Sequence, residues 1–142
     1  MITRLFVFGT LRAGFPNFAI NRGRRVPGRF RTEAAYPLFL VGERHVPWML
    51  DAAGTGFAVL GELYDVDAPA LREMDALERV GQPDGYVRQA IRVVAADAAG
   101  GVPLPVQAYL KPAHTLAPQD IRLGPLADYT LAHAARYRRP TA

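Results

Sequence analysis

The chain has 142 residues, of which 50% are hydrophobic and 21% are charged, and this balance predicts a single globular domain spanning residues 1–142. Because cysteine is absent, a disulfide framework, a thiolate metal cage and a cysteine nucleophile are excluded. The apolar runs are far too short to span a bilayer or to form a signal-peptide core, so we expect a cytoplasmic protein without a membrane partner.

The basic balance raises the question of a nucleic-acid partner. The net charge is +4, and arginine can bind phosphate in a bidentate manner. The arginines are scattered in ones and twos, however, and no basic helix or strand with interleaved aromatic residues emerges. We therefore expect no nucleic-acid partner.

The N-terminal part of the chain predicts a strand that leads into a loop. Residues 5–8 are β-prone and run directly into the turn-rich segment 9–14. Residues 15–29 contain prolines, glycines and arginines, a composition that favours a surface connection. At most a short helix near residues 18–21 is expected there.

Five later segments have the composition of strands. Residues 36–41 and 46–50 are apolar runs separated by Gly42 and charged residues, which predicts that they are neighbours. The other predicted strands are residues 57–66, 86–95 and 106–110.

Two segments predict helices. Asp67 is a suitable N-cap, Pro69 suits a first turn, and residues 70–79 have helical composition and spacing. Residues 125–137 would form a second helix with an aromatic and apolar stripe. Because strands outnumber helices and several connections are too short for βαβ crossovers, the sequence predicts an α+β fold with a mixed, strongly curved or closed sheet.

The first predicted helix carries a carboxylate on its buried face. At about 100° per residue, Glu78 falls among the apolar side chains and Asp75 lies at the edge of that stripe. A buried carboxylate costs several kcal/mol unless it is paired or protonated, so such a residue usually has a function. The alternative is that Glu78 lies beyond the last full turn and turns to solvent or pairs with an arginine.

The end of the first predicted strand is a second candidate. It consists of Phe8, Gly9, Thr10 and Leu11, called here the 8–11 loop. Glycine lets backbone approach a ligand closely, and amides that leave a strand can donate to an anionic group. The loop lacks the second glycine and the Lys-Ser or Lys-Thr pair of a phosphate loop, and a plain turn explains the same residues.

Other catalytic classes find little support. The three histidines are not at metal-ligand spacing and cysteine is absent, so we expect no metal site. Serine is also absent, which excludes a serine hydrolase. Tyr36, Trp48, Tyr86 and Tyr109 could line a pocket, but aromatic residues at strand spacing are more often core residues.

Five segments, taken in order, resemble the gamma-glutamylcyclotransferase-like family. They are LFVFGTLRAGFPN (5–17), YPLFLVGE (36–43), VPWML (46–50), GELYDVD (61–67) and LREMDALE (71–78). The resemblance runs from about residue 4 to Lys111, and the branch that it resembles most is that of the gamma-glutamylamine cyclotransferases.

The resemblance implies a small mixed β-barrel flanked by short helices, with a cavity at one side. It also implies a small-molecule substrate and a reaction without metal or cofactor. In that reaction the α-amino group of a γ-glutamylamine, or of a related γ-glutamyl amide, attacks the γ-carbonyl, which forms 5-oxoproline and releases the amine. Proximity supplies much of the rate, so one carboxylate is sufficient to move the proton.

The resemblance also implies the roles of particular residues. Glu78 would be the general acid/base, at the end of the family's Asp-x-x-Glu motif. The 8–11 loop corresponds to the family's Tyr-Gly-Ser/Thr-Leu loop, whose amides would bind the substrate carboxylate or the developing oxyanion. Tyr109 corresponds to a family aromatic residue on a late strand. Phe8 departs from the family pattern because it keeps the ring and lacks the hydroxyl.

Two functions therefore stay open. The first is a cyclotransferase that acts on γ-glutamylamines or related amides. The second is a non-catalytic barrel that binds an amino-acid-like ligand, since Phe8 shows that the loop has drifted. Glu78 on the buried face favours the enzyme, because a binding pocket has no need of an unpaired acid. The sequence predicts neither the amine that is released nor the oligomeric state.

Overall fold

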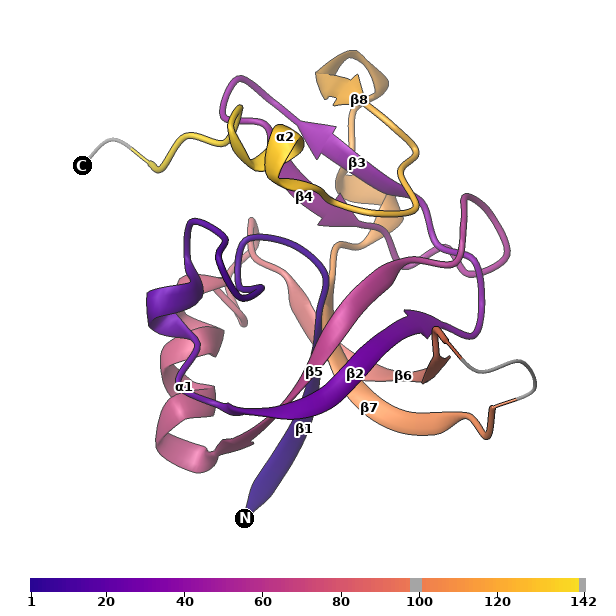
Figure 1. Ribbon diagram of the computed structural model, residues 1–142. Helices are drawn as coiled ribbons and strands as arrows, with labels where there is room; N and C mark the ends of the chain where they lie inside the picture. The colour runs from indigo at the N-terminus through magenta and orange to yellow at the C-terminus, as the bar shows by residue number, and fades with distance from the viewer. Residues whose placement is uncertain (98–100, 141–142) are drawn as a thin grey trace.

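The computed structural model describes residues 1–97 and 101–140, and its central feature is a closed five-stranded barrel (Figure 1). The barrel strands are β1 (Ile2–Val7), β2 (Arg24–Thr32), β5 (Leu60–Asp67), β6 (Val87–Ala95) and β7 (Leu104–Leu110). Their order is β1-β5-β2-β6-β7, and β1 closes the barrel by pairing in parallel with β7, whereas the other pairs are antiparallel. The expected α+β fold with a small mixed barrel is confirmed.

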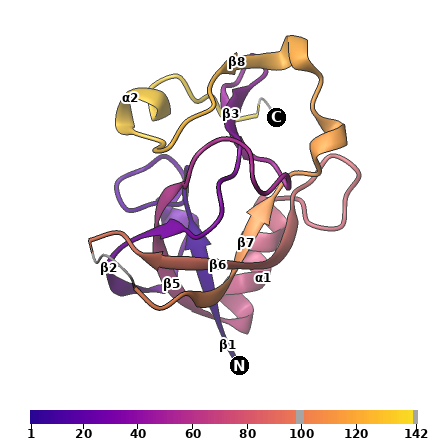
Figure 2. The ribbon, with the colours of Figure 1, turned by 90° about the vertical axis from the view of Figure 1, so that its right-hand side faces the viewer.

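A second sheet lies above the barrel in both ribbon views (Figures 1 and 2). It consists of β3 (Leu38–Val41), β4 (Val46–Met49) and β8 (Ile121–Leu123) in the order β4-β3-β8. The antiparallel pairing of β3 with β4 confirms that residues 36–41 and 46–50 are neighbouring strands.

The helices are short and lie outside the two sheets. They are α1 (Ala68–Leu77), α2 (Leu131–Ala134) and three 3-10 turns, η1 (Phe18–Ile20), η2 (Ala113–Thr115) and η3 (Pro118–Asp120). The short helix expected near residues 18–21 is present as the 3-10 helix η1. No helix in the part of the chain that the structure describes is long and apolar enough to cross a membrane.

Helix α1 begins where the sequence predicts. The Asp67 carboxylate accepts the N–H of Ala70 at 2.9 Å, and Pro69 occupies the first turn, where its missing N–H leaves no bond unmade. Ala70 and Met74 are buried. The helix is thereby fixed to the outside of the barrel, together with the residues that follow it.

Alternation along β1 divides the hydrophobic core into two clusters. Phe6 packs with Leu63 of the barrel and Leu38 of the second sheet. Leu5, its neighbour in sequence, belongs to the other cluster, which includes Met74 of α1. Because successive side chains of a strand point to opposite faces, β1 contributes side chains to both clusters.

The predicted surface connection over residues 15–29 is wrong in its second half. Residues from 24 onward form β2, which pairs with β5 on one side and β6 on the other. Pro27 and Gly28 fall where the register shifts between Val26 and Phe30, and Gly28 has a φ of 103°. An irregularity of this kind accommodates residues that a regular ladder excludes, so they interrupt β2 without ending it.

The predicted helix over residues 125–137 is also wrong, because only the four residues of α2 are helical. The N–H of Leu126 donates to the carbonyl of Leu38, and the carbonyl of Ala127 accepts from Leu60, both at 2.8 Å. Backbone groups that a helix would use internally are therefore bonded to other segments.

Candidate active site

A cavity of about 610 Å³ is lined by both sheets and by the segment that follows α1. Every residue that the sequence singled out for substrate or catalysis lines it. These residues are Phe8, Gly9, Thr10, Leu11, Glu78 and Tyr109. The fold thus brings together the end of β1, the end of α1 and the end of β7 around one space.

The end of α1 fixes the position of Glu78. The N–H of Arg79 donates to the carbonyl of Ala76 at 3.1 Å, and that of Val80 donates to the carbonyl of Asp75 at 3.0 Å. This is a Schellman motif, in which Glu78 is the C-cap and Arg79 adopts the left-handed conformation with a φ of 54°. The carbonyl of Glu78 also accepts the N–H of Tyr86, at 3.0 Å, so its backbone is held on both sides.

The carboxylate of Glu78 is half-buried at the cavity wall and has no hydrogen bond or ion pair among the described residues. Burial raises the pKa of Glu78 from its ordinary value to about 7, and the nearby Lys111 opposes this rise. The expectation that Glu78 would turn to solvent or pair with an arginine does not describe the structure. The cavity therefore contains a carboxyl group that can exchange a proton near neutral pH.

In the 8–11 loop, the carbonyl groups of Gly9, Thr10 and Leu11 are bonded within the protein, whereas their amides have no partner among the described residues. The bonds are Arg12 N–H to Gly9, Asn17 N–H to Thr10 and Asn21 Nδ2–H to Leu11, at 3.1, 2.8 and 3.0 Å. No hydrogen bond within the described residues uses the N–H of Gly9, Thr10 or Leu11. A Cβ at Gly9 would lie 2.9 Å from Cγ of Pro47, so only glycine fits there without displacement.

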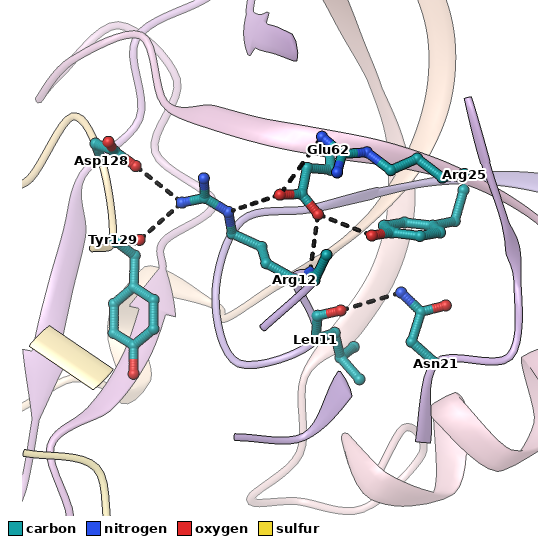
Figure 3. Close-up of polar contacts among 9 residues, drawn as sticks. Leu11, Arg12, Asn21, Arg25, Glu62, Asp128 and Tyr129 are labelled. Carbon is teal, nitrogen blue, oxygen red and sulfur yellow. Dashed lines mark hydrogen bonds and ion pairs between the residues drawn. The ribbon is translucent and has the colours of Figure 1, made fainter. Parts of the chain in front are cut away.

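A second carboxylate, Glu62, is buried and does not line the cavity. Its contacts lie next to the 8–11 loop (Figure 3). Its oxygens accept the N–H of Ala13 at 3.0 Å and the hydroxyl of Tyr64 at 2.8 Å. Arg12 and Arg25 form ion pairs with it at 3.5 and 3.6 Å. Glu62 is thus fully partnered, and this distinguishes a structural acid from the unpaired Glu78.

Arg12 also joins the loop to the C-terminal segment (Figure 3). Its Nη1 donates to the carboxylate of Asp128 at 2.8 Å and to the carbonyl of Tyr129 at 2.7 Å. The same segment continues to Tyr137 and Pro140, which line the cavity. One arginine therefore connects two walls of the site.

Tyr109 presents its ring to the cavity, but its hydroxyl is already engaged. The hydroxyl donates to Asp75 at 2.7 Å, and Asp75 also accepts two bonds from Arg88, at 3.0 and 3.2 Å. Burial first, and the Asp75 bond second, raise the pKa of Tyr109 well above its ordinary value. Asp75, which the sequence placed at the edge of the buried stripe, thus supports a cavity residue.

The aromatic residues that the sequence offers for a pocket divide between cavity and core. Trp48 and Tyr86 line the cavity, although a core position was favoured for them, whereas Tyr36 does pack in the core. Lys111 is a further lining residue and is the only lysine of the chain. No local sequence signal marks it as a site residue, because its place in the cavity depends on the closure of the barrel.

The histidines have no common site. The Nδ1 of His133 accepts the N–H of Thr130 at 2.9 Å, which caps α2. Within residues 1–97 and 101–140, no three His, Asp or Glu side chains are grouped so that they could hold a metal ion.

The protein is a small mixed barrel whose cavity is lined by a carboxylate without an ion pair and by amides without partners among the described residues. This arrangement is typical of a protein that binds a small molecule. A model of the family described as "Gamma-glutamyl cyclotransferase, AIG2-like" matches residues 5–131. The gamma-glutamylaminecyclotransferase of Rattus norvegicus is 36% identical over 145 residues, which cover 96% of this chain and 96% of the relative. That of Bos taurus is 36% identical over 140 residues, covering 94% of this chain and 80% of the relative.

A solved structure of the same family has a similar fold. The crystal structure of an AIG2-like protein from Mus musculus covers 99% of this chain and 98% of its own, with a TM-score of 0.84 and 31% identity. The chain therefore belongs to the gamma-glutamyl cyclotransferase, AIG2-like family. The resemblance inferred from the sequence is confirmed.

Proposed function

We propose that the chain converts a γ-glutamylamine, or a related γ-glutamyl amide, to 5-oxoproline and free amine, with Glu78 as the general acid/base. The observation that carries the proposal is that an unpaired carboxylate and the free amides of the 8–11 loop line one cavity. The relatives from Rattus norvegicus and Bos taurus are named as gamma-glutamylaminecyclotransferases, which supports this substrate class.

In the proposed reaction the α-amino nitrogen of the substrate attacks the γ-carbonyl carbon of the same molecule. The new C–N bond closes the ring of 5-oxoproline, and the bond to the amine breaks when the tetrahedral intermediate collapses. Because nucleophile and electrophile belong to one molecule, holding the substrate folded converts binding energy directly into rate.

Glu78 would carry the proton from the attacking amine to the leaving amine. The α-ammonium must lose one proton before it attacks, and the same nitrogen must lose a second one when the ring forms. The leaving nitrogen gains one proton as its bond to carbon breaks, and the free amine gains another from water, so no proton is consumed overall. A carboxyl group with a pKa of about 7 can accept the first proton at neutral pH and donate it in the second step.

The amides of the 8–11 loop would stabilise negative charge on the substrate. Their orientation is set before substrate binds, because the neighbouring carbonyls are bonded to Arg12, Asn17 and Asn21. Donors that are already oriented lose little free energy by reorganisation when charge develops on the carbonyl oxygen. The same donors could instead bind the substrate carboxylate.

The alternative function is binding of an amino-acid-like ligand without turnover. Phe8 favours this alternative, since it lacks the hydroxyl of the family loop. The unpaired Glu78 favours the enzyme, because a carboxylate held without partners weakens the fold unless it has a chemical use.

A substrate panel separates the two functions. The chain is incubated with γ-glutamyl amines, γ-glutamyl dipeptides and glutathione, and 5-oxoproline release is measured together with ligand binding. Release from at least one class supports the cyclotransferase. Binding of a class by calorimetry, without release from any, supports the alternative.

Activity is expected to survive exhaustive chelation. The proposed steps use one carboxyl group and backbone amides, and none of them needs a Lewis acid. The measurement is 5-oxoproline release after extended dialysis against EDTA. A loss of turnover that a divalent cation restores would overturn the mechanism.

Phe8→Tyr is expected to leave kcat/KM within about tenfold of the parent value, equivalent to about 1.4 kcal/mol. The ring of Phe8 is buried, with its centroid 6.3 Å from that of Phe6, and the proposed contacts of the loop come from the backbone. Steady-state kinetics test this. A much larger gain would mean that the family hydroxyl has a catalytic role that this chain has lost.

A further inference from the structure

Lys111 places a positive charge in the cavity wall that the proposed reaction does not use. Its Nζ donates to the carbonyl of Asp84 at 2.6 Å and lies 4.2 Å from the ring centre of Trp48 and 4.8 Å from that of Tyr86. The residue is buried, and all three partners are electrically neutral. The ion pairs of the described residues do not include it. Its charge is held in place by its contacts but not neutralised by them.

The carboxylate of Glu78 likewise has no ion pair, and it has no hydrogen bond, among the described residues. Two tyrosine hydroxyls face it, and both donate elsewhere: Tyr86 to the carbonyl of Pro47 at 2.8 Å, and Tyr109 to Asp75 at 2.7 Å. Neither hydroxyl is therefore available to stabilise the ionised carboxylate. Lys111, which directly follows β7, lines the same cavity, and its positive charge acts on Glu78.

Tyr86 contacts both residues. The Nζ of Lys111 lies over the ring of Tyr86, and the backbone N–H of Tyr86 donates to the backbone carbonyl of Glu78 at 3.0 Å. The other charged groups that face Lys111 are Asp84 and Arg79, which pair with each other at 2.9 Å at the surface. Glu78 and Lys111 thus remain as two opposite charges without ion-pair contacts in one cavity, where screening by water is weak.

We propose that Lys111 is the electrostatic partner of Glu78, a positioning residue whose charge keeps the carboxylate ionised and ready to accept a proton. The catalytic consequence rests on the proposed function, whereas the coupling between the two charges does not. Burial raises the pKa of Glu78, and the positive charge of Lys111 lowers it, which is the direction expected of a nearby cation.

The coupling is tested on the free protein by following the carboxyl carbon of Glu78 in an NMR pH titration. Lys111→Met keeps an unbranched stem between the two rings and removes the charge, and Lys111→Arg keeps the charge. We expect the Met variant to raise the titration midpoint of Glu78 by roughly half to one pH unit and the Arg variant to stay near the parent. An unchanged midpoint in a folded Lys111→Met protein would overturn the proposal.

A reciprocal titration covers the case in which Lys111→Met fails to fold. Coupling between two sites is mutual, so Glu78→Gln must lower the titration midpoint of Lys111 if Lys111 lowers that of Glu78. Because Lys111 is the only lysine, its ε-carbon signal is unambiguous. A Lys111 midpoint that is the same with and without the Glu78 charge contradicts the coupling.

The catalytic consequence has its own measurement. The acid limb of the kcat/KM profile for 5-oxoproline release should move upward in Lys111→Met by the same amount as the Glu78 titration. If the titrations shift but the parent releases no 5-oxoproline, the charge coupling stands and the proposed function fails. If the parent releases 5-oxoproline and the titrations do not shift, the proposed function stands and Lys111 has no such role.

Discussion

Glu78→Gln is expected to lower kcat for 5-oxoproline release by about 10²- to 10⁴-fold. Glutamine keeps the size of the side chain and its capacity for hydrogen bonds, but it cannot accept the proton of the attacking amine. KM should change little, because the proposed binding contacts come from the 8–11 loop. Steady-state kinetics on the folded variant provide the measurement.

Glu73→Gln is the matched control for this substitution. Glu73 lies on α1 as well, but it is exposed and pairs with Arg22 outside the cavity, so its loss should leave activity essentially intact. Asp75→Asn is a poorer control, because Asp75 holds the hydroxyl of Tyr109. An active Glu78→Gln protein, or one that is inactive only because it unfolds, defeats the assignment.

Glu78→Gln should become more stable relative to the parent as the pH rises. Burial raises the pKa of folded Glu78 to about 7 from an ordinary value of 4.5, so ionising it costs free energy in the fold and not in the unfolded chain. That cost is absent below about pH 4.5 and complete above about pH 7. The free energy of unfolding of Glu78→Gln, relative to the parent, should therefore be larger at pH 8 than at pH 4.5 by about 3 kcal/mol. Denaturant unfolding at both pH values checks this, and a pH-independent difference contradicts it.

Glu62→Ala is expected to lower the free energy of unfolding by about 3 kcal/mol. The substitution leaves the buried hydroxyl of Tyr64 and the N–H of Ala13 without their acceptor, and it removes the ion-pair partner of Arg12. Because Ala13 and Arg12 follow the 8–11 loop directly, the loop should also lose its fixed orientation. Denaturant unfolding measures the first effect, and amide hydrogen exchange at Arg12 and Asn17, whose N–H groups donate to the loop carbonyls of Gly9 and Thr10, measures the second.

Two variants on the same strand calibrate this expectation. Asp65→Ala removes a carboxylate from an exposed pair with Arg4 and should cost at most about 1 kcal/mol. Glu62→Gln keeps an acceptor for Ala13 and should fall between the parent and Glu62→Ala. A Glu62→Ala protein as stable as Asp65→Ala, with unchanged exchange at the loop, would show that the network does not hold the loop.

Local rules were sufficient for the parts of the fold whose signals lie close together in sequence. Asp67 and Pro69 mark the start of α1, and the helical period then places Glu78 toward the interior. The pattern of two apolar runs around Gly42 similarly predicts the β3–β4 pair. In each case the structure is decided by interactions within about ten residues.

The failures concern segments whose structure is decided by distant partners. Pro27 and Gly28 suggest a connection, but pairing with β5 and β6 makes a strand of the residues around them. The C-terminal segment has helical composition, yet Leu38 and Leu60 compete for its backbone groups. Tertiary hydrogen bonds outweigh local propensity at both places.

The cavity was only partly predictable for the same reason. Motifs near the ends of β1 and α1 point to the 8–11 loop and Glu78. Lys111 belongs to the site because the closure of the barrel brings the end of β7 beside the end of α1. No local pattern contains that information.

The most direct test of the account is a product analysis in water enriched in ¹⁸O with a γ-glutamyl amine as substrate. Intramolecular attack predicts 5-oxoproline and free amine in equal amounts, with no solvent oxygen in the 5-oxoproline, because the nucleophile is the α-amino nitrogen. Glutamate that carries solvent oxygen would show hydrolysis instead of cyclisation, and the absence of any product from every γ-glutamyl amine and amide tried would contradict catalysis at Glu78.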